Sequence, residues 1–224
     1  PNPVQINTSI TATAAFADPG TLDTHTATAN WGDGNTAASC SVNQSSDTVS
    51  CTHPNGGYAT ANVYPVTITV SDGVLSGTSP VAYASVYNPT QGSIFSAGQR
   101  FNNPSTAFPN TNGNVTFGLN YKYQGGIPQG VRQFSMDFNA ANIHYNATTV
   151  SSLVISGSTA TLIGTGTFNG SGNYDFLVVG VDGDGIRIKI TDPGNGNAVV
   201  YDCQNGDAYT ATPITSVTGQ VVVN

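Results

Sequence analysis

Alternation of apolar and polar residues with a period of two is the feature that most limits how this chain folds. In "NVTFGLNYKY" at 114–123, every second residue from Val115 to Tyr123 is apolar or aromatic. The stretch "YPVTITV" at 64–70 repeats the pattern. Such alternation puts the large apolar side chains on one face of a strand. Since no stretch of a dozen residues combines a helical apolar period with good helix formers, the sequence predicts an all-β protein.

Few side chains carry charge, which excludes some partners. Charged residues make up 8% of the chain, against roughly 25% in ordinary globular proteins. Five dispersed Lys and Arg residues do not neutralise a run of phosphates, so we expect no nucleic-acid partner. No apolar run approaches the roughly 18 residues that span a bilayer, so we expect no membrane span.

A surface built from Thr, Ser, Asn and Gly favours an extracellular, secreted or cell-surface setting. The start at Pro1 suggests that the chain is part of a longer product.

Two of the cysteines are placed for a cross-strand disulfide. Cys40 and Cys51 flank "SVNQSSDTVS", and a hairpin with its tip at Ser45 and Ser46 puts them opposite each other. This geometry suits a disulfide, whereas the alternative is a pair of buried thiols. We favour the disulfide, and we expect the leftover Cys203 to be a buried free thiol, with an intermolecular bridge as the alternative.

Turn residues divide the alternating stretches into two β domains. Residues 1–87 contain short strands between "DPG", "GDG" and "SDG" turns, which describe a β-sandwich. "NPTQG" at 88–92 reads as a short linker. Residues 93–224 continue as hairpins and predict an eight- to ten-stranded antiparallel sandwich or barrel.

The first domain resembles a polycystic-kidney-disease (PKD) domain, which has an immunoglobulin-like sandwich fold. The Trp/Phe-Gly-Asp-Gly signature of that family falls on "WGDG" at 31–34, and its late strand falls on "YPVTITVSD" at 64–72. The segment before Pro3 is short for a complete first strand. That strand is therefore either truncated, or completed by upstream sequence or by a neighbouring chain. Residues 93–224 are similar to an uncharacterised β domain that follows PKD modules in bacterial surface and secreted proteins.

Aspartates at strand ends are the candidate metal ligands. Asp18, Asp23, Asp33 and Asp72 are expected to meet at one pole of the sandwich. The PKD resemblance implies that Asp18 and Asp72 hold a structural Ca²⁺, since carboxylates on loops suit calcium. The alternative, which we favour, is that each aspartate caps its own turn. No other cofactor is implied, and the three histidines show no ligand spacing for zinc.

The sequence shows no credible catalytic set. No Gly-x-Ser-x-Gly motif occurs, and no pair of carboxylates stands out for glycoside hydrolysis. Phe101, Phe108 and Tyr145 are candidate ligand-binding aromatics that would stack on sugars or pack on a partner. The alternative is that these aromatic side chains belong to the core.

These features predict a non-enzymatic extracellular module with a structural or adhesive function. Its partners would be other protein subunits or cell-surface components, and open strand edges would allow self-association by strand addition. A surface filament is one form that such an assembly would take. The short N-terminus and the apolar "TGQVVV" at 218–223 favour such pairing. The alternative is an accessory carbohydrate-binding region of a secreted hydrolase, with glycans as ligands.

Overall fold

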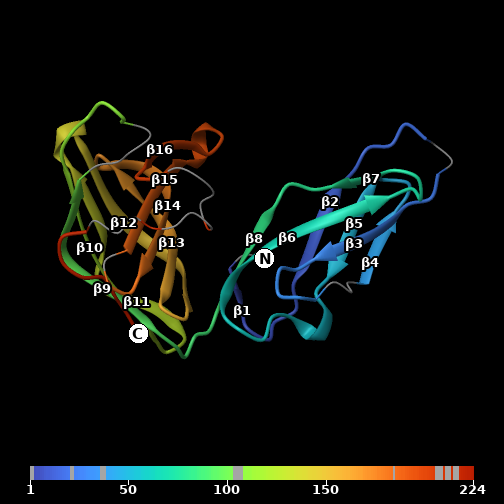
Figure 1. Cartoon of the computed structure of the whole chain (residues 1–224), viewed down its shortest axis with the longest axis horizontal. Coiled ribbons are helices and arrows are strands. Elements are labelled where there is room, and N and C mark those ends of the chain that lie inside the picture. Colours follow the sequence, from blue (N-terminus) through green and yellow to red (C-terminus); the bar gives the residue numbers. More distant parts are fainter. Residues whose placement is uncertain are drawn as a thin grey trace. The chain divides into compact units, whose positions relative to one another are not determined.

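The protein is all-β, as predicted, and divides into two compact units. A computed structural model describes residues 3–20, 23–35, 39–102, 108–183, 185–204, 209, 213 and 217–224. The units comprise residues Pro1–Tyr87 and Asn88–Asn224 (Figure 1). No helix in these described ranges has the length and apolarity of a membrane span.

The first unit is an immunoglobulin-like sandwich of two layers. One layer has the strand order β1-β8-β6-β3, with β7 also paired to β6, and the other has the order β2-β5-β4. The elements are β1 (Val4–Gln5), β2 (Thr11–Ala15), β3 (Thr26–Asn30), β4 (Ser39–Asn43), β5 (Thr48–Thr52), the 3-10 helix η1 (Pro54–Gly56), β6 (Asn62–Ser71), β7 (Ser76–Thr78) and β8 (Ala82–Tyr87). β1 pairs with β8 in parallel, whereas β2, β3 and β6 pair with their neighbours antiparallel.

Alternating residues of these strands fill the space between the layers. Ile68 and Val66 of β6 and Val49 of β5 are buried, as the period-two pattern predicts. Trp31, directly after β3, is completely buried. Its backbone carbonyl accepts a hydrogen bond of 2.9 Å from the Tyr58 hydroxyl. The single tryptophan of the chain is therefore an anchor of the sandwich core.

The β4–β5 hairpin has the register that the cysteine spacing predicts. Cys40 lies opposite Cys51, and Val42 lies opposite Val49. The two cysteines form a disulfide, which confirms the pairing expected from the sequence. Cys51 is completely buried, so the bond attaches the edge strand β4 to the core.

The second unit is built from one nine-stranded sheet with the order β16-β15-β14-β13-β12-β11-β10-β9-β17. Its elements are β9 (Ser93–Asn102), β10 (Asn114–Gln124), β11 (Ile127–Phe138), η2 (Asn139–Ala141), β12 (Ile143–Ser156), β13 (Thr159–Phe168), β14 (Ser171–Val181), β15 (Gly185–Asp192), η3 (Pro193–Asn195), β16 (Ala198–Asp202) and β17 (Val222–Val223). The pairs that join β9 to β16 are antiparallel hairpin neighbours, as expected for this domain.

This sheet curls on itself and encloses its own core. The backbones of Gly183, in the β14–β15 turn, and Val221, just before β17, exchange two hydrogen bonds of 2.8 Å. The inner faces of β10 and β14 therefore contribute to the same core, which includes Phe117, Phe134 and Phe176. Figure 1 shows β9, β10 and β11 along one side of this unit and β13 to β15 along the other.

A buried ion pair and a buried thiol lie where β15 meets β16. Arg187 has no exposed surface, and its guanidinium forms a two-pronged contact with the Asp202 carboxylate, at 3.2 and 2.9 Å. Cys203 is a buried free cysteine, as predicted. Its sulfur accepts a hydrogen bond of 3.1 Å from the Ile188 backbone N–H. Burial raises the pKa of the Cys203 thiol to about 12.

The disulfide leads to a first prediction, for the paired substitution Cys40→Ser and Cys51→Ser. A bond that closes a loop this short limits the unfolded chain and stabilises the fold by about 2–3 kcal/mol. We expect the double variant to lose that amount in the free energy of unfolding of the first unit, measured with denaturant and Trp31 fluorescence. Reduction of the wild-type protein should reproduce the loss. An unchanged unfolding midpoint in both experiments would contradict a stabilising role.

Candidate functional site

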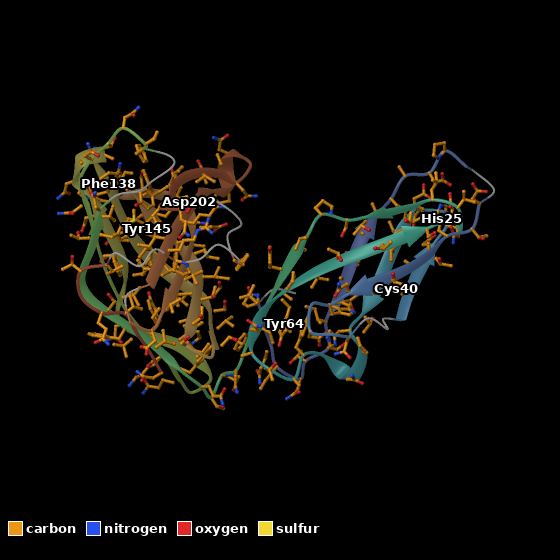
Figure 2. The ribbon with its side chains drawn as sticks, viewed as in Figure 1. His25, Cys40, Tyr64, Phe138, Tyr145 and Asp202 are labelled. Atoms are coloured by element: carbon orange, nitrogen blue, oxygen red, sulfur yellow. A yellow bond between two sulfur atoms is a disulfide. The ribbon has the colours of Figure 1, made fainter. Side chains whose placement is uncertain are left out.

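One end of the first unit brings together two of the predicted metal ligands and a histidine. Asp18 follows β2, His25 precedes β3 and Asp72 follows β6. The three side chains line one cavity of about 480 Å³. They meet because β3 is antiparallel to β6 and begins where β6 ends. Figure 2 shows His25 and Tyr64 at opposite ends of this unit.

His25 is held by the side chain of Gln44 and faces Asp18. Gln44 Oε1 accepts a hydrogen bond from the His25 backbone N–H, at 3.2 Å, while Gln44 Nε2 donates to the His25 carbonyl, at 3.0 Å. These bonds orient the amide, so Oε1 is also the acceptor 2.9 Å from His25 Nδ1. The other ring nitrogen, Nε2, lies 3.2 Å from Asp18 Oδ2, although this buried oxygen has no aligned hydrogen bond. Both ring nitrogens of His25 therefore face oxygen atoms, Gln44 Oε1 and Asp18 Oδ2.

Asp72 closes the turn between β6 and β7. Its Oδ1 accepts hydrogen bonds from the backbone N–H groups of Leu75, at 2.6 Å, and Val74, at 2.7 Å. These two donors lower the pKa of Asp72, because they stabilise the charged form. The Asp72 side chain therefore has the turn-capping role that was the alternative to metal binding.

The carboxylates of Asp18 and Asp23 lie near each other beside Gly20, whereas Asp72 Oδ1 is bonded within its own turn. Ca²⁺ takes about six to eight oxygen ligands. Here the His25 ring lies against Asp18 Oδ2 and occupies one side of that carboxylate. No three His, Cys or Asp side chains in the described part of the chain form a group that would hold a metal.

Asp33 lies at the other end of the sandwich, which corrects the expectation that it joins Asp18 and Asp72. It follows β3, and the pairing of Asn30 with Thr67 puts the end of β3 beside the middle of β6, whereas the start of β3 lies beside the end of β6. Its Oδ1 accepts a hydrogen bond of 3.0 Å from the Asn35 backbone N–H. Asp33 therefore caps the "WGDG" turn, in agreement with the interpretation of that motif as a turn beside a core anchor.

His53 connects this turn to the core. Its Nε2 lies 3.1 Å from Asp33 Oδ2, and its Nδ1 faces the Pro54 carbonyl. The ring packs on Trp31 and Tyr58, with centroid separations of 5.0 and 4.2 Å. Asp33 thus affects the stability of the sandwich through a buried imidazole rather than through an exposed reactive group.

Each of the three histidines has an aspartate partner that was not predicted from the sequence. His144 Nδ1 lies 2.7 Å from Asp137 Oδ1, and the two residues face each other across the β11–β12 hairpin. Residues at equal distances from the turn between β11 and β12 face each other, so the position of that turn would have predicted the pairing of Asp137 with His144. The contacts of His25 with Asp18 and of His53 with Asp33 join separate segments, and no local spacing indicates them.

One side of the first unit, between β2 and the β7–β8 edge, is open. β1 covers only the far half of this side, where Val4 pairs with Val86 and is 4% exposed. Along the other half runs the cavity of about 480 Å³, whose apolar lining includes Phe16 and Val70. Both side chains pack against the core but are only half-buried, and Leu75 beside them is 74% exposed. We call this region the open side; it is the candidate functional site.

The candidate aromatic ligands in the second unit lie in or against its core. Phe101 and Tyr145 are each 1% exposed, because they occupy inward-facing positions of β9 and β12. Phe108 is half-buried and packs edge-on against Phe138, with ring centroids 6.2 Å apart. Figure 2 shows Tyr145 in the interior of this unit. The structure therefore corrects the prediction for Phe101 and Tyr145, since neither ring presents a face to a ligand.

Comparison with known proteins does not identify the chain: no protein-family model matches it, and no curated protein matches it. The resemblance to PKD domains therefore stays a prediction from the residues quoted for it.

The environment of Asp33 predicts a pH dependence of stability. Burial alone would raise the pKa of Asp33, but hydrogen bonds from Asn35 and the contact with His53 lower it below the usual 3.8. A carboxyl with a lowered pKa stabilises the fold above its unfolded pKa, and this stabilisation is lost as the pH falls through the folded pKa. We expect Asp33→Asn to reduce stability at pH 7 by about 1 kcal/mol or less and to weaken the loss of stability below about pH 4.

Denaturant unfolding at a series of pH values tests this expectation. Asp47→Asn is the matched control, because Asp47 lies in the β4–β5 turn of the same sandwich, away from His53. Identical acid dependence in Asp33→Asn and the wild type would show that the Asp33 carboxylate is not coupled to folding. Loss of a binding activity in a folded Asp33→Asn protein would contradict its structural role.

The arrangement at Asp18 and Asp72 predicts the response to calcium. Because His25 faces Asp18 and Asp72 caps its own turn, we expect the same thermal midpoint in excess Ca²⁺ and in EDTA. Differential scanning calorimetry measures this midpoint. A rise with Ca²⁺ that Asp18→Asn abolishes would instead establish the calcium site implied by the PKD resemblance.

Proposed function

We propose that this protein is a non-catalytic extracellular module with a structural or adhesive function, which joins other protein subunits or cell-surface components through its open side. The observation that carries the proposal is the incomplete edge of the first sandwich. There a cavity with a partly apolar lining lies beside β2, a strand that pairs on one side only with a strand in the described part of the chain. A strand from another chain would complete both the sheet and the core.

Strand addition is the interaction that this surface supports best. An unpaired strand edge offers a row of backbone N–H and C=O groups, and natural proteins usually protect such edges with charges, prolines or bulges. β2 has the sequence "TATAA", which contains no charged residue and no proline. Its register with β5 shows no bulge. Main-chain hydrogen bonds supply affinity in this mode, and apolar pockets supply specificity.

An extracellular setting agrees with the disulfide and the low charge. The Cys40–Cys51 bond is of a type that persists in oxidising compartments and is rare in the cytosol. Only 8% of the residues are charged, so two copies that approach edge to edge bring few like charges together. Both features support a module that works in contact with other subunits.

A catalytic function has less support at this site. The Asp18 carboxylate faces His25, and Asp72 caps its turn, so neither carboxylate is placed as an isolated acid or base. The alternative of a carbohydrate-binding region is also weaker. Two of its three predicted aromatic residues, Phe101 and Tyr145, are buried.

Electron microscopy and analytical ultracentrifugation of the full chain test the proposal. We expect oligomers or fibres whose fraction rises with protein concentration and which persist in moderate salt, because backbone pairing is not an ionic interaction. Strictly monomeric particles at high concentration, with no binding to cell-surface material, would contradict the proposed function.

A further inference from the structure

The free edge of β2 has a defined set of backbone donors and acceptors. Phe16 donates its backbone N–H to Asp47, and the Ile10 carbonyl accepts from His53, so the even-numbered residues of this segment point toward β5. Backbone groups alternate in direction along an antiparallel strand. The N–H and C=O groups of Thr11, Thr13 and Ala15 therefore point away from the sandwich, and no strand in the described part of the chain pairs with them.

We infer that β2 pairs with β2 of a second copy of this chain, antiparallel and centred on Thr13. The inference rests on the proposed function and names its partner. In this register Thr13 faces Thr13 of the second copy, and Thr11 faces Ala15. All three outward-pointing residues of each strand then exchange hydrogen bonds with their counterparts. The two three-stranded layers become one continuous sheet across a twofold axis, as an isologous interface requires.

The side chains agree with the same register. Pairs of residues whose numbers sum to 26 share a face, so Ile10 lies opposite Phe16 and Ala12 lies opposite Ala14. These are the inward-facing residues of β2. Ala12, Ala14 and Phe16 are only half-buried in the single chain, and Ile10 is buried. Pairing of the two β2 strands therefore joins the apolar face of one copy to that of the other. The joined face lies at the open side, where a single copy has a cavity.

Charge favours a second copy as the occupant. No residue from Thr8 to Ala17 is charged, and the register puts Asp18 opposite Thr8, so no two aspartates face each other across the seam. The flat, uncharged edge would repel neither strand, although each chain has a net charge of −7.

The C-terminal segment, also expected to favour pairing, already has partners within the chain. Val222 and Val223 pair with β9 on one side. On the other side, Val221 is bonded to Gly183, and the Val223 N–H donates to Asp182 Oδ1, at 3.1 Å. At the β3–β4 side of the first unit, the Gln44 side chain forms hydrogen bonds with the backbone N–H and C=O groups of His25.

Cysteine cross-linking of the full chain tests the register. Cys40 and Cys51 are bonded and Cys203 is buried, so a cysteine introduced on β2 is the accessible thiol. Facing residues in an antiparallel pair have Cα atoms about 5.5 Å apart, within the range of a disulfide. We expect Thr13→Cys to form a covalent dimer under mild oxidation, detected on a non-reducing gel.

Thr11→Cys and Ala15→Cys are the matched controls. Each is displaced by about 13 Å from its own copy in this register, so neither variant should dimerise alone. An equimolar mixture of the two should form a mixed dimer, because Thr11 faces Ala15. If Thr13→Cys cross-links no faster than Ala15→Cys while the protein still associates, the inference is wrong and another edge serves the proposed function. If no variant associates at any concentration, the inference is wrong, and binding of the full chain to cell-surface material then decides the proposed function.

A charge substitution gives an independent readout. The Thr13 side chain is exposed in β2, so Thr13→Lys should leave the fold and its thermal midpoint intact. It would put two like charges face to face in the seam, and we expect it to shift the concentration dependence of association by at least tenfold. Thr28→Lys on β3 adds the same charge to another exposed strand position and should leave association unchanged. Equal effects of the two variants would overturn the inference.

Discussion

Backbone hydrogen bonding at strand edges is the constraint on which the rest of this structure depends. A strand leaves half of its N–H and C=O groups unpaired unless a neighbour covers them. The second unit meets part of this requirement by curling a nine-stranded sheet until the β14–β15 turn bonds to the C-terminal segment at Val221, while β16 stays at an edge of the sheet. The first unit has two separate layers and closes only part of its perimeter, with β1 on one side and the Gln44 side chain on the other. The functional proposal follows from β2, one of the strands that has a neighbour on one side only in the described part of the chain.

The chain has few charged side chains, and several of them lie in contacts between oppositely charged or polar residues. All three histidines contact an aspartate, and the buried Arg187 is matched to Asp202 by a two-pronged contact. An isolated buried charge is costly, and removal of one partner from a buried pair typically destabilises a protein by about 3–5 kcal/mol. In both units, these polar groups therefore join different strands and turns of the fold, including pairs close in the sequence such as Asp137 and His144.

The sequence predicted the parts of the fold that depend on local patterns. The alternation in β6 and β10 indicated which face is buried, and the spacing of Cys40 and Cys51 defined the register of their hairpin. The meeting of Asp18 with Asp72 was also anticipated, because both follow strands that end at the same pole. Asp33 was placed wrongly, since its position depends on the direction in which β3 pairs with β6. The burial of Phe101 and Tyr145 follows from the curl of the whole sheet, which strand alternation alone does not specify.

The buried thiol of Cys203 has a consequence for how the chain matures. Three cysteines allow three alternative pairings, and exchange among them requires a thiolate as the attacking group. Because burial raises the pKa of Cys203 to about 12, almost none of it is ionised at neutral pH once the second unit has folded. Cys40 and Cys51 are only eleven residues apart in the sequence and meet within a single hairpin. Oxidation of the cysteines therefore favours the Cys40–Cys51 bond, and the buried Cys203 thiol of the folded second unit is a poor nucleophile for exchange with it.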